Sequence, residues 1–223
     1  MPIGFRVLTR QCAVTAEQVE RYRNLPVANI SDSMQRMTAG GAGLRPYHRG
    51  GALLGVALTV KCRPGDNLML HYALNIAEPG DVIVVDSGGD LTNALIGELM
   101  LAFAQKKQLA GVVINGAVRD TASIAASDFP VYARGVTHRG PYKNGPGEIN
   151  VPIAIDGMVI EPGDLIVGDP DGVLCVPFDQ VDAVYELASA RHLAEQSKLQ
   201  SIAEERNDRS WVLNALLAAG CDL

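Results

Sequence analysis

The strongest constraint on the fold is a nine-residue pattern that occurs twice in the chain. Residues 78–86 read EPGDVIVVD, and residues 161–169 read EPGDLIVGD, 83 positions later. In each copy Pro-Gly favours a tight turn, and an apolar, β-rich run follows it and ends at an aspartate. A spacing of this length is too long for a solenoid repeat. The two copies therefore predict two related strands that enter one central β structure.

The rest of the chain alternates between helical and strand-like patterns. Thr15 and Gln18 form a capping box, Pro26 suits the first turn of a helix, and Asp66 suits a helix cap. Helices are predicted over residues 15–24, 26–37, 67–77, 97–108, 121–126, 179–206 and 210–219. Strands are predicted over residues 52–62, 82–86, 112–115, 130–133, 151–155, 158–160, 165–167 and 173–177. This mixture of crossovers and hairpins indicates an α/β fold with helices outside a central β structure.

Three local details complete this prediction. Gly55 is expected to form a bulge in its strand. Residues 87–96 and 135–147 are expected to be glycine-rich loops. The helix over residues 97–108 is expected to turn Leu99, Ala102 and Phe103 toward the core.

Length, composition and charge exclude several classes of protein. A chain of 223 residues with 48% hydrophobic and 20% charged residues is ordinary for a globular protein of one large or two small domains. The net charge of −6 argues against non-specific binding to nucleic acid or to a membrane surface. The chain has no apolar run long enough for a bilayer span and no signal-peptide pattern at its start. We expect a cytoplasmic protein with no nucleic-acid or membrane partner.

Cysteine and histidine spacings do not indicate a metal site. The four cysteines are scattered, without a C-x-x-C pair, and we expect them to be reduced and structural. The four histidines share no ligand spacing. These residues are Cys12, Cys62, Cys175, Cys221, His48, His71, His138 and His192.

The segment 111–120, GVVINGAVRD, carries the clearest candidate chemistry. An apolar strand runs into a glycine-bounded turn, which ends at the adjacent pair Arg119 and Asp120. An arginine can hold a carboxylate with two hydrogen bonds, and an aspartate can bind a hard divalent cation. Together they suit an anionic, metal-chelating substrate such as a 2-oxo acid. An ordinary ion pair at a strand end fits the same two residues.

A second candidate lies at the start of the helix predicted after Gly97. Free N–H groups in the first turn of a helix bind anions, and Leu99 and Met100 would supply them here. Glu98 would be stabilised by the helix dipole at the same place. An ordinary glycine-rich loop fits this segment equally well. The chain lacks G-x-G-x-x-G, Walker A and G-x-S-x-G motifs, which disfavours nucleotide binding and a serine hydrolase site.

The order of these motifs resembles the RraA-like family. That family includes the class II aldolases that act on 4-hydroxy-4-methyl-2-oxoglutarate and 4-carboxy-4-hydroxy-2-oxoadipate. The matching segments are residues 78–86, 97–98, 111–120, 130–135, 145–152 and 162–173. The resemblance implies a layered β/β/α fold of the swivelling phosphohistidine-domain type. It also implies a single domain over residues 1–223, with a helical extension from about residue 179.

The resemblance further implies a reaction and a role for each site residue. The reaction is divalent-metal-dependent cleavage of a 4-hydroxy-2-oxo acid to release pyruvate, with oxaloacetate decarboxylation beside it. Arg119 would bind the carboxylate and carbonyl of the pyruvyl group. Asp120 would be the direct protein ligand of Mg²⁺ or Mn²⁺, and Glu98 would hold a metal-bound water. The amides of Leu99 and Met100, beside Gly97, would complete the substrate pocket.

The resemblance also implies an assembly, and it has one departure. Family members form trimers or hexamers whose sites lie between subunits and include a glutamate from the neighbouring C-terminal helix. Glu195 is our first candidate for it, and Glu204 and Glu205 are alternatives. Ser123 stands where the aldolases have an acidic residue, so the substrate is open. The family also contains non-catalytic regulators of ribonuclease E, which typically lack the aspartate, and such a regulator is the alternative function.

Overall fold

Strand β3 (Leu53–Cys62) is the centre of the computed structural model, which describes residues 2–38 and 40–223. Strand β4 (Asp81–Asp86) lies parallel to it on one edge, and β11 (Leu165–Asp169) lies antiparallel on the other. Val56 of β3 pairs with Asp81 on one side and with Leu165 on the other. The two copies of the repeated pattern therefore enter the sheet on opposite edges of one strand, which confirms the prediction of two related entries.

The two entry turns use the same hydrogen bond. Asp81 Oδ2 accepts the Glu78 N–H at 2.9 Å, and Asp164 Oδ2 accepts the Glu161 N–H at 2.8 Å. In each turn the aspartate thus closes the Glu-Pro-Gly-Asp loop onto its own first residue.

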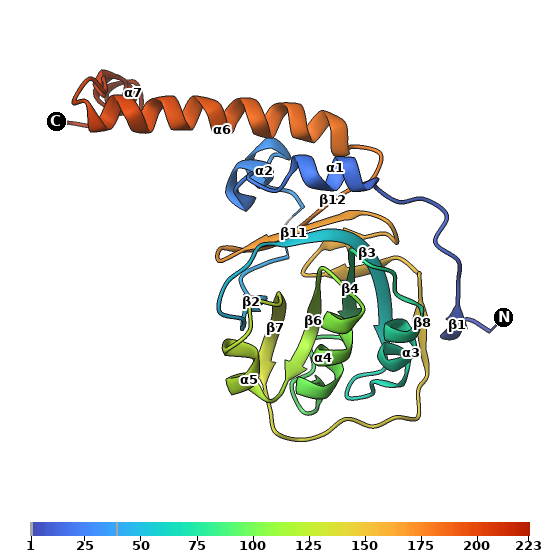
Figure 1. Ribbon diagram of the computed structural model, residues 1–223. Coiled ribbons are helices and arrows are strands. Elements are labelled where there is room, and N and C mark those ends of the chain that lie inside the picture. The colour runs from blue at the N-terminus through green and yellow to red at the C-terminus, as the bar shows by residue number, and fades with distance from the viewer. Residues whose placement is uncertain (1, 39) are drawn as a thin grey trace.

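The main sheet has the order β1-β8-β3-β4-β6-β7-β2 (Figure 1). Strands β3, β4, β6 and β7 are parallel to one another, whereas β8 and β11 are antiparallel to β3, and β2 is antiparallel to β7. The remaining strands of the sheet are β1 (Phe5–Val7), β2 (Arg45–Pro46), β5 (Ala94–Ile96), β6 (Gly111–Val118), β7 (Val131–Val136), β8 (Gly147–Ile149) and β12 (Gly172–Val176). Strands β9 (Ile153–Ile155) and β10 (Met158–Ile160) form an antiparallel hairpin, and both strands were predicted.

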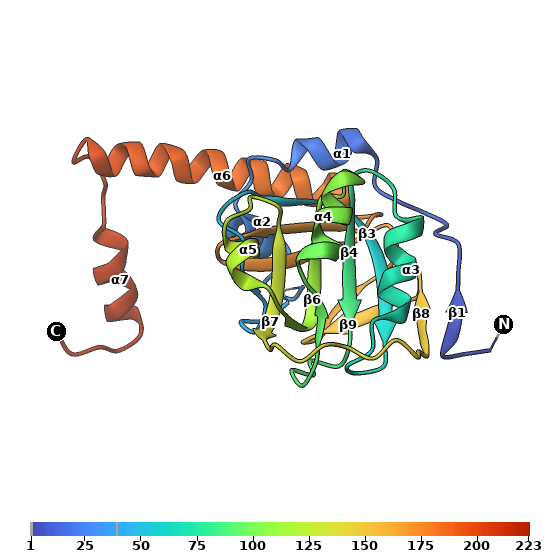
Figure 2. The ribbon, with the colours of Figure 1, turned by 60° about the horizontal axis from the view of Figure 1, so that its bottom comes forward.

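Helices cover the β structure from two sides (Figures 1 and 2). Helices α3, α4 and α5 lie over the parallel strands, and α1, α2 and α6 lie beyond β11 and β12. The helices are α1 (Ala16–Arg21), α2 (Val27–Ser33), α3 (Leu68–Ile76), α4 (Glu98–Lys106), α5 (Thr121–Ala125), α6 (Val181–Ala203) and α7 (Ser210–Ala218). No helix in the described residues combines the length and the hydropathy that a bilayer crossing needs.

Alternate residues of the strands face two different cores. In β4, Ile83 and Val85 pack in a cluster with α3 and α4, while Val82 and Val84 pack with the β9–β10 hairpin. A third cluster joins β11 and β12 to α2 and α6, around Ile30. Helices therefore lie outside a central β structure. This layered arrangement confirms the predicted α/β fold, a layered β/β/α structure.

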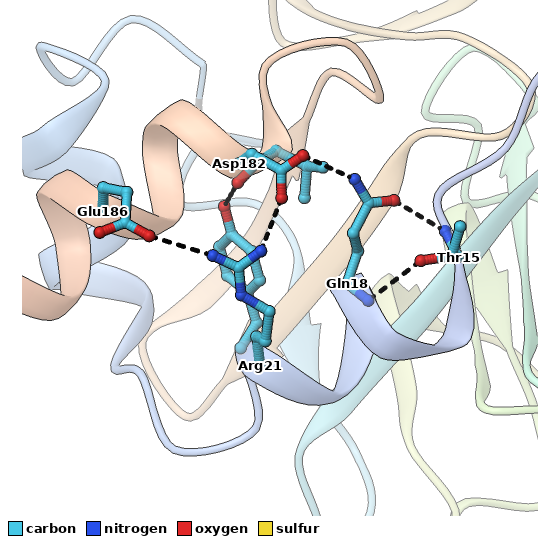
Figure 3. Close-up of polar contacts among 7 residues, drawn as sticks. Thr15, Gln18, Arg21, Asp182 and Glu186 are labelled. Atoms are coloured by element: carbon cyan, nitrogen blue, oxygen red, sulfur yellow. Dashed lines mark hydrogen bonds and ion pairs between the residues drawn. The ribbon is translucent and has the colours of Figure 1, made fainter.

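Polar contacts fasten the start of α6 to α1 (Figure 3). Asp182 accepts hydrogen bonds from Gln18 at 3.0 Å and from Arg21 at 2.6 Å, and Arg21 also pairs with Glu186. The predicted capping box is present, so the side chain of Thr15 fixes the first turn of α1. Beyond this anchored part α6 extends past the rest of the fold, and α7 stands at its far end (Figures 1 and 2).

The predicted second helix was too long. Helix α2 ends at Ser33 and not near Met37. Gln35 and Arg36 have φ angles of 58° and 63°, and two consecutive left-handed residues cannot continue a right-handed helix.

Two predictions about packing were also wrong. The buried residues of α4 are Leu101 and Ala104, whereas Leu99 is 85% exposed and Phe103 is also exposed. Gly55 forms no bulge, because it pairs in regular register with Ile166. Glycine is needed there for space, since a Cβ would overlap the carbonyl oxygen of Gly80.

Both glycine-rich segments are shorter than predicted, because strands occupy parts of them. The segment 87–96 contains β5, which pairs with β6. Strand β7 runs to Val136, and β8 begins at Gly147. Cys62 and Cys175 lie buried in β3 and β12 as expected, and all four cysteines are free thiols.

Candidate functional site

The buried strand β6 continues to Val118, through the glycine-bounded turn that we predicted before Arg119 and Asp120. Its pairing with β7 shifts register between Ile114 and Ala117, so the extra length is a bulge inside the strand. Gly116 lies in this bulge, where a Cβ would approach Ser87 Oγ to 2.6 Å. Because β6 continues to Val118, Arg119 and Asp120 stand at the carboxyl end of a parallel strand, the usual place for a site in an α/β sheet.

Arg119 and Asp120 are adjacent but only loosely paired. Arg119 Nε lies 3.9 Å from Asp120 Oδ2, and the two side chains are 44% and 42% exposed. The Arg119 amide donates to the Ile96 carbonyl at 3.1 Å, which ties the end of β6 to the end of β5. Asp120 has a left-handed φ of 60°, an unfavourable conformation for a non-glycine residue that is typical of functional sites. The guanidinium and the carboxylate therefore both remain available to a ligand.

The first turn of α4 packs directly against this pair. The Glu98 amide donates to Asp120 Oδ2 at 2.9 Å. Gly97 is required here, because a Cβ would overlap Asp120 Oδ2 and would lie 2.9 Å from Arg119 Cγ. The Met100 amide donates to the Gly97 carbonyl at 3.1 Å, whereas the Leu99 amide has no hydrogen bond to the described residues. Leu99 is thus the amide donor that is free for an anion.

All six predicted site residues lie in one cleft of about 310 Å³. Its polar lining includes three residues that the sequence analysis did not select: Asn67, His71 and Lys143. Asn67 and His71 are four positions apart at the start of α3, and this spacing puts two side chains on one helix face. That spacing was the available signal, but it could not indicate which face of α3 meets the cleft.

His71 and Lys143 influence each other in this cleft. Burial lowers the pKa of His71 below its usual value of 6.5, and the positive charge of Lys143 lowers it further. The imidazole is therefore neutral near pH 7, and Lys143 is the cation of this part of the cleft.

Asp66 fastens the loop that carries Lys143 to the start of α3. Its carboxylate accepts the backbone N–H groups of Leu68 at 2.9 Å, Asn144 at 2.7 Å and Gly145 at 3.0 Å. Burial disfavours the charged carboxylate, but these three donors and Arg63 outweigh it, so the pKa of Asp66 is lowered. Asp66 was predicted as a helix cap, and it also joins two distant segments of the chain.

Comparison with known proteins assigns the chain to a family. A family model described as RraA-like, Aldolase/RraA, matches residues 27–175. The chain belongs to the RraA-like family. A curated relative from Halalkalibacterium halodurans, named "Putative 4-hydroxy-4-methyl-2-oxoglutarate aldolase", is 38% identical over 83% of this chain and 89% of its own length.

Two solved structures extend this RraA-like assignment to the fold. An uncharacterized protein from Pseudomonas syringae superposes with a TM-score of 0.77 at 25% identity, over 86% of this chain and 94% of its own. The RNA-processing inhibitor RraA from Thermus thermophilis superposes with a TM-score of 0.63 at 30% identity, over 68% of this chain and 92% of its own. The RraA-like family thus includes relatives named for catalysis and relatives named for inhibition.

The donor set of this RraA-like chain fits a hard cation that keeps most of its waters. Asp120 and Glu98 are exposed, and Asp120 Oδ1 accepts no hydrogen bond from the described residues. The described residues contain no group of three or more His, Cys, Asp or Glu side chains placed to hold a metal. Mg²⁺ commonly binds to proteins through one or two carboxylates and retains several waters, so two carboxylates are sufficient.

Four further predicted residues, Ser123, Glu195, Glu204 and Glu205, do not line the cleft. Ser123 and Glu98 line a neighbouring groove between α4 and α5, so Ser123 is close to the site without lining it. Glu195 is on α6, where its carboxylate accepts a hydrogen bond from Asn29 at 2.7 Å. Glu204, at the end of α6, pairs with Arg206.

Proposed function

We propose that this RraA-like protein is a divalent-metal-dependent lyase that cleaves a 4-hydroxy-2-oxo acid and releases pyruvate. The observation that carries the proposal is the convergence of Arg119, Asp120 and the free Leu99 amide in one cleft. Substrates of the 4-hydroxy-4-methyl-2-oxoglutarate or 4-carboxy-4-hydroxy-2-oxoadipate type fit this site. The name of the Halalkalibacterium halodurans relative supports an aldolase.

The residues of the cleft divide the chemistry among them. The Arg119 fork and the Leu99 amide bind the carboxylate of the pyruvyl group. The charge of Arg119 then stabilises the negative charge that grows on the C2 oxygen as the C3–C4 bond breaks and leaves the enolate of pyruvate. The Glu98 carboxylate orients a water that accepts the proton of the C4 hydroxyl, and the same water then returns a proton to C3 of the enolate, which gives pyruvate.

Asp120 would hold Mg²⁺ or Mn²⁺ directly, and Glu98 would hold it through a water. When bound, the cation would supply Lewis-acid polarisation of the substrate carbonyl. The same cleft can also serve oxaloacetate decarboxylation, because loss of CO₂ leaves the same enolate beside Arg119. Protein binding of the ribonuclease-inhibitor type would not need the Asp120 carboxylate. A variant without this carboxylate therefore distinguishes a lyase from a protein-binding regulator.

The test is pyruvate release from 4-hydroxy-4-methyl-2-oxoglutarate and from oxaloacetate, with Mg²⁺, Mn²⁺ or a chelator. We expect turnover that needs the metal and falls at least about 1,000-fold in Asp120→Ala, since loss of a direct ligand removes several kcal/mol of transition-state stabilisation. Mn²⁺ binding, measured by calorimetry, should weaken in parallel.

The matched control is Asp128→Ala, because Asp128 is an exposed carboxylate paired with Arg49 outside the cleft. It should retain activity and Mn²⁺ binding. Activity of Asp120→Ala within threefold of the unmodified protein, with the fold intact by circular dichroism, would remove Asp120 from the proposed mechanism.

A further inference from the structure

Strand β6 changes its pairing at Asn115. On one edge Asn115 is the last residue that pairs with β4, through Asp86, and two positions later Ala117 pairs with β5. On the other edge Asn115 and Gly116 together oppose a single residue of β7, Arg134. The regular ladder is therefore interrupted on both edges of β6 at the same point, just before the strand end that carries the candidate site.

The side chain of Asn115 bridges this interruption. It is 5% exposed, its Nδ2 donates to Asp86 Oδ1 at 2.8 Å, and its Oδ1 accepts a hydrogen bond from Arg134 Nε. An ionised carboxylate can only accept and a guanidinium can only donate, so the two partners need a side chain with one donor and one acceptor. An asparagine amide meets this requirement, whereas an aspartate would place a second carboxylate against Asp86.

Further hydrogen bonds extend the bridge to the neighbouring segments. The Asn115 carbonyl accepts the Gly89 amide at 3.1 Å and Ser87 Oγ at 2.8 Å, so the loop between β4 and β5 is attached at the same residue. Arg134 also pairs with Asp156 in the turn between β9 and β10. Asn115 is thus held by β4, by β7 and by the loop that leads to β5, and Arg134 connects it to the β9–β10 hairpin.

Beyond Asn115, the end of β6 is joined to short segments. The Arg119 amide donates to the Ile96 carbonyl, and the Thr137 amide donates to the Val118 carbonyl, each at 3.1 Å. Strand β5, which supplies the first of these carbonyls, is only three residues long. A slip of β6 at Asn115 would therefore displace the site residues that follow it.

We infer that Asn115, held between Asp86 and Arg134, is a positioning residue for the candidate site. It fixes the offset at which the end of β6 lies between β5 and β7, and it thereby aims Arg119 and Asp120 into the cleft. A displacement of about 1 Å at the reacting groups can lower a rate about 100-fold, so a small slip of the strand is sufficient. The inference rests on the proposed function for the reaction that Arg119 and Asp120 serve.

Steady-state kinetics of Asn115→Ala test this role. We expect kcat for pyruvate release to fall about 10–100-fold while KM changes less than about threefold. A displaced positive charge still attracts the substrate carboxylate, whereas the transition state needs the aligned groups. A kcat within threefold of that of the unmodified protein would overturn the inference.

Asn150→Ala is the matched control. Asn150 also makes a side-chain hydrogen bond, from Nδ2 to the Leu8 carbonyl at 2.9 Å, and it does not line the cleft. Its left-handed φ of 57° makes alanine unfavourable there, so this variant lowers the stability away from the site. It should keep kcat within threefold. An equal loss of kcat in Asn150→Ala would overturn the inference, because loss of stability would then explain both variants.

Hydrogen–deuterium exchange tests the position of the strand without turnover. In Asn115→Ala the amides of Arg119 and Thr137 should exchange at least about tenfold faster. The Val112 amide, which donates to the Pro130 carbonyl before the interruption, should change less than about threefold. A merely stabilising side chain would speed all three amides by the same factor, and that result would contradict a positioning role.

A second variant breaks the bridge from its other end. Arg134→Met removes the donor to Asn115 Oδ1 and should give the same pattern of kcat, KM and amide exchange. If Asn115→Ala does not fold, Arg134→Met decides by the same criteria. The two proposals fail separately: the expected exchange pattern without pyruvate release would contradict the lyase and leave the positioning role, whereas pyruvate release with unchanged kcat and exchange in the variants would contradict the positioning role.

Discussion

The Arg119 side chain lines the cleft and offers a planar guanidinium as well as a positive charge. Its guanidinium is only loosely paired with Asp120, and Gly140 leaves space beside Nη1, where a Cβ would lie 3.3 Å away. Lysine keeps the charge but loses the planar pair of donors. We predict that Arg119→Lys lowers kcat/KM about 10–100-fold, with a higher KM and a lower kcat, in steady-state assays of pyruvate release.

Arg49→Lys is a suitable comparison for Arg119→Lys. Arg49 makes a two-bond contact with Asp128 at an exposed position, so the same exchange changes the surface and not the cleft. An unchanged kcat/KM in Arg119→Lys would assign Arg119 a structural role only.

We expect the choice between aldol cleavage and decarboxylation to depend on the single residue Ser123. It lines the groove that also contains Glu98, and the family resemblance implies an acidic residue at this position. A serine can hydrogen-bond a water but adds no charge, and losses of this kind typically cost about 10–100-fold. We predict that Ser123→Glu raises the rate of aldol cleavage at least fivefold more than the rate of oxaloacetate decarboxylation.

The two rates should be measured side by side, with Ser123→Ala as the variant that removes the hydroxyl and adds no charge. If Ser123→Glu changes both rates equally, or neither, Ser123 has no part in substrate choice.

At the scale of single residues, the sequence was sufficient to select the candidate residues in one half of the cleft. Arg119, Asp120 and Glu98 could be selected because their residue types match a 2-oxo acid and because the motif order resembles a known family. Asn67 and Lys143 could not be selected, since they are 76 positions apart and line one cleft because Asp66 and backbone hydrogen bonds join their segments. A contact between distant segments leaves no periodic signal in the sequence.

Among the elements, the strands were predicted best where both faces are buried. Residues 82–85 of β4 are apolar without interruption, because the two faces of the strand pack against different layers. The end of β6 was predicted wrongly, because the sequence alone does not show whether a glycine lies in a turn or in a bulge. Only the pairing with β5 and β7 shows that the strand continues to Val118.

The attachment of the loop that carries Lys143 to the start of α3 depends on the charge of Asp66. Its side chain is 1% exposed, and its lowered pKa means that the folded state favours the carboxylate. Asp66→Asn replaces one of the two acceptor oxygens by an N–H donor, so the side chain can no longer accept from Leu68 on one atom and from Asn144 and Gly145 on the other. We predict a loss of about 1–3 kcal/mol in the free energy of unfolding at pH 7, measured by denaturant titration.

The contribution of Asp66 to the free energy of unfolding depends on pH, and the lowered pKa gives the direction of this dependence. Because the pKa is lowered from its ordinary value of 3.8, the contribution of Asp66 is fully present above that value. It is lost as the pH falls through the folded-state pKa. The stability gap between the unmodified protein and Asp66→Asn should therefore narrow below about pH 4. A gap that stays constant down to pH 2.5 would contradict the role of the ionised carboxylate.

The whole molecule leaves much apolar surface uncovered on its C-terminal arm, which we define as residues 190–223. Helix α7 has no buried residue, and the outer part of α6 carries further exposed apolar side chains. The exposed apolar residues of this arm are Leu193, Leu199, Ile202, Trp211, Leu213, Leu216, Leu217 and Leu223. Such a surface is typical of an interface between subunits.

We predict that the protein is a trimer of about 71 kDa, three times the chain mass of 23.7 kDa, or a dimer of trimers. Light scattering at micromolar concentration measures the mass. Trp211 is the single tryptophan of the chain and is 58% exposed within one subunit, so assembly should shield it from acrylamide quenching. A monomeric mass, or a tryptophan fully open to acrylamide, would exclude the arm as a subunit interface.

Because β1 pairs with β8, β1 cannot join the sheet until β8 has been synthesised. Arg6 of β1 forms an ion pair with Glu148 of β8, 142 positions later in the chain. At translation rates of 5–20 residues per second, about 7–30 seconds pass between these two residues. During that time the first strand has no edge to join. Strand β1 therefore leaves the ribosome well before β8 and is among the last strands to reach its place.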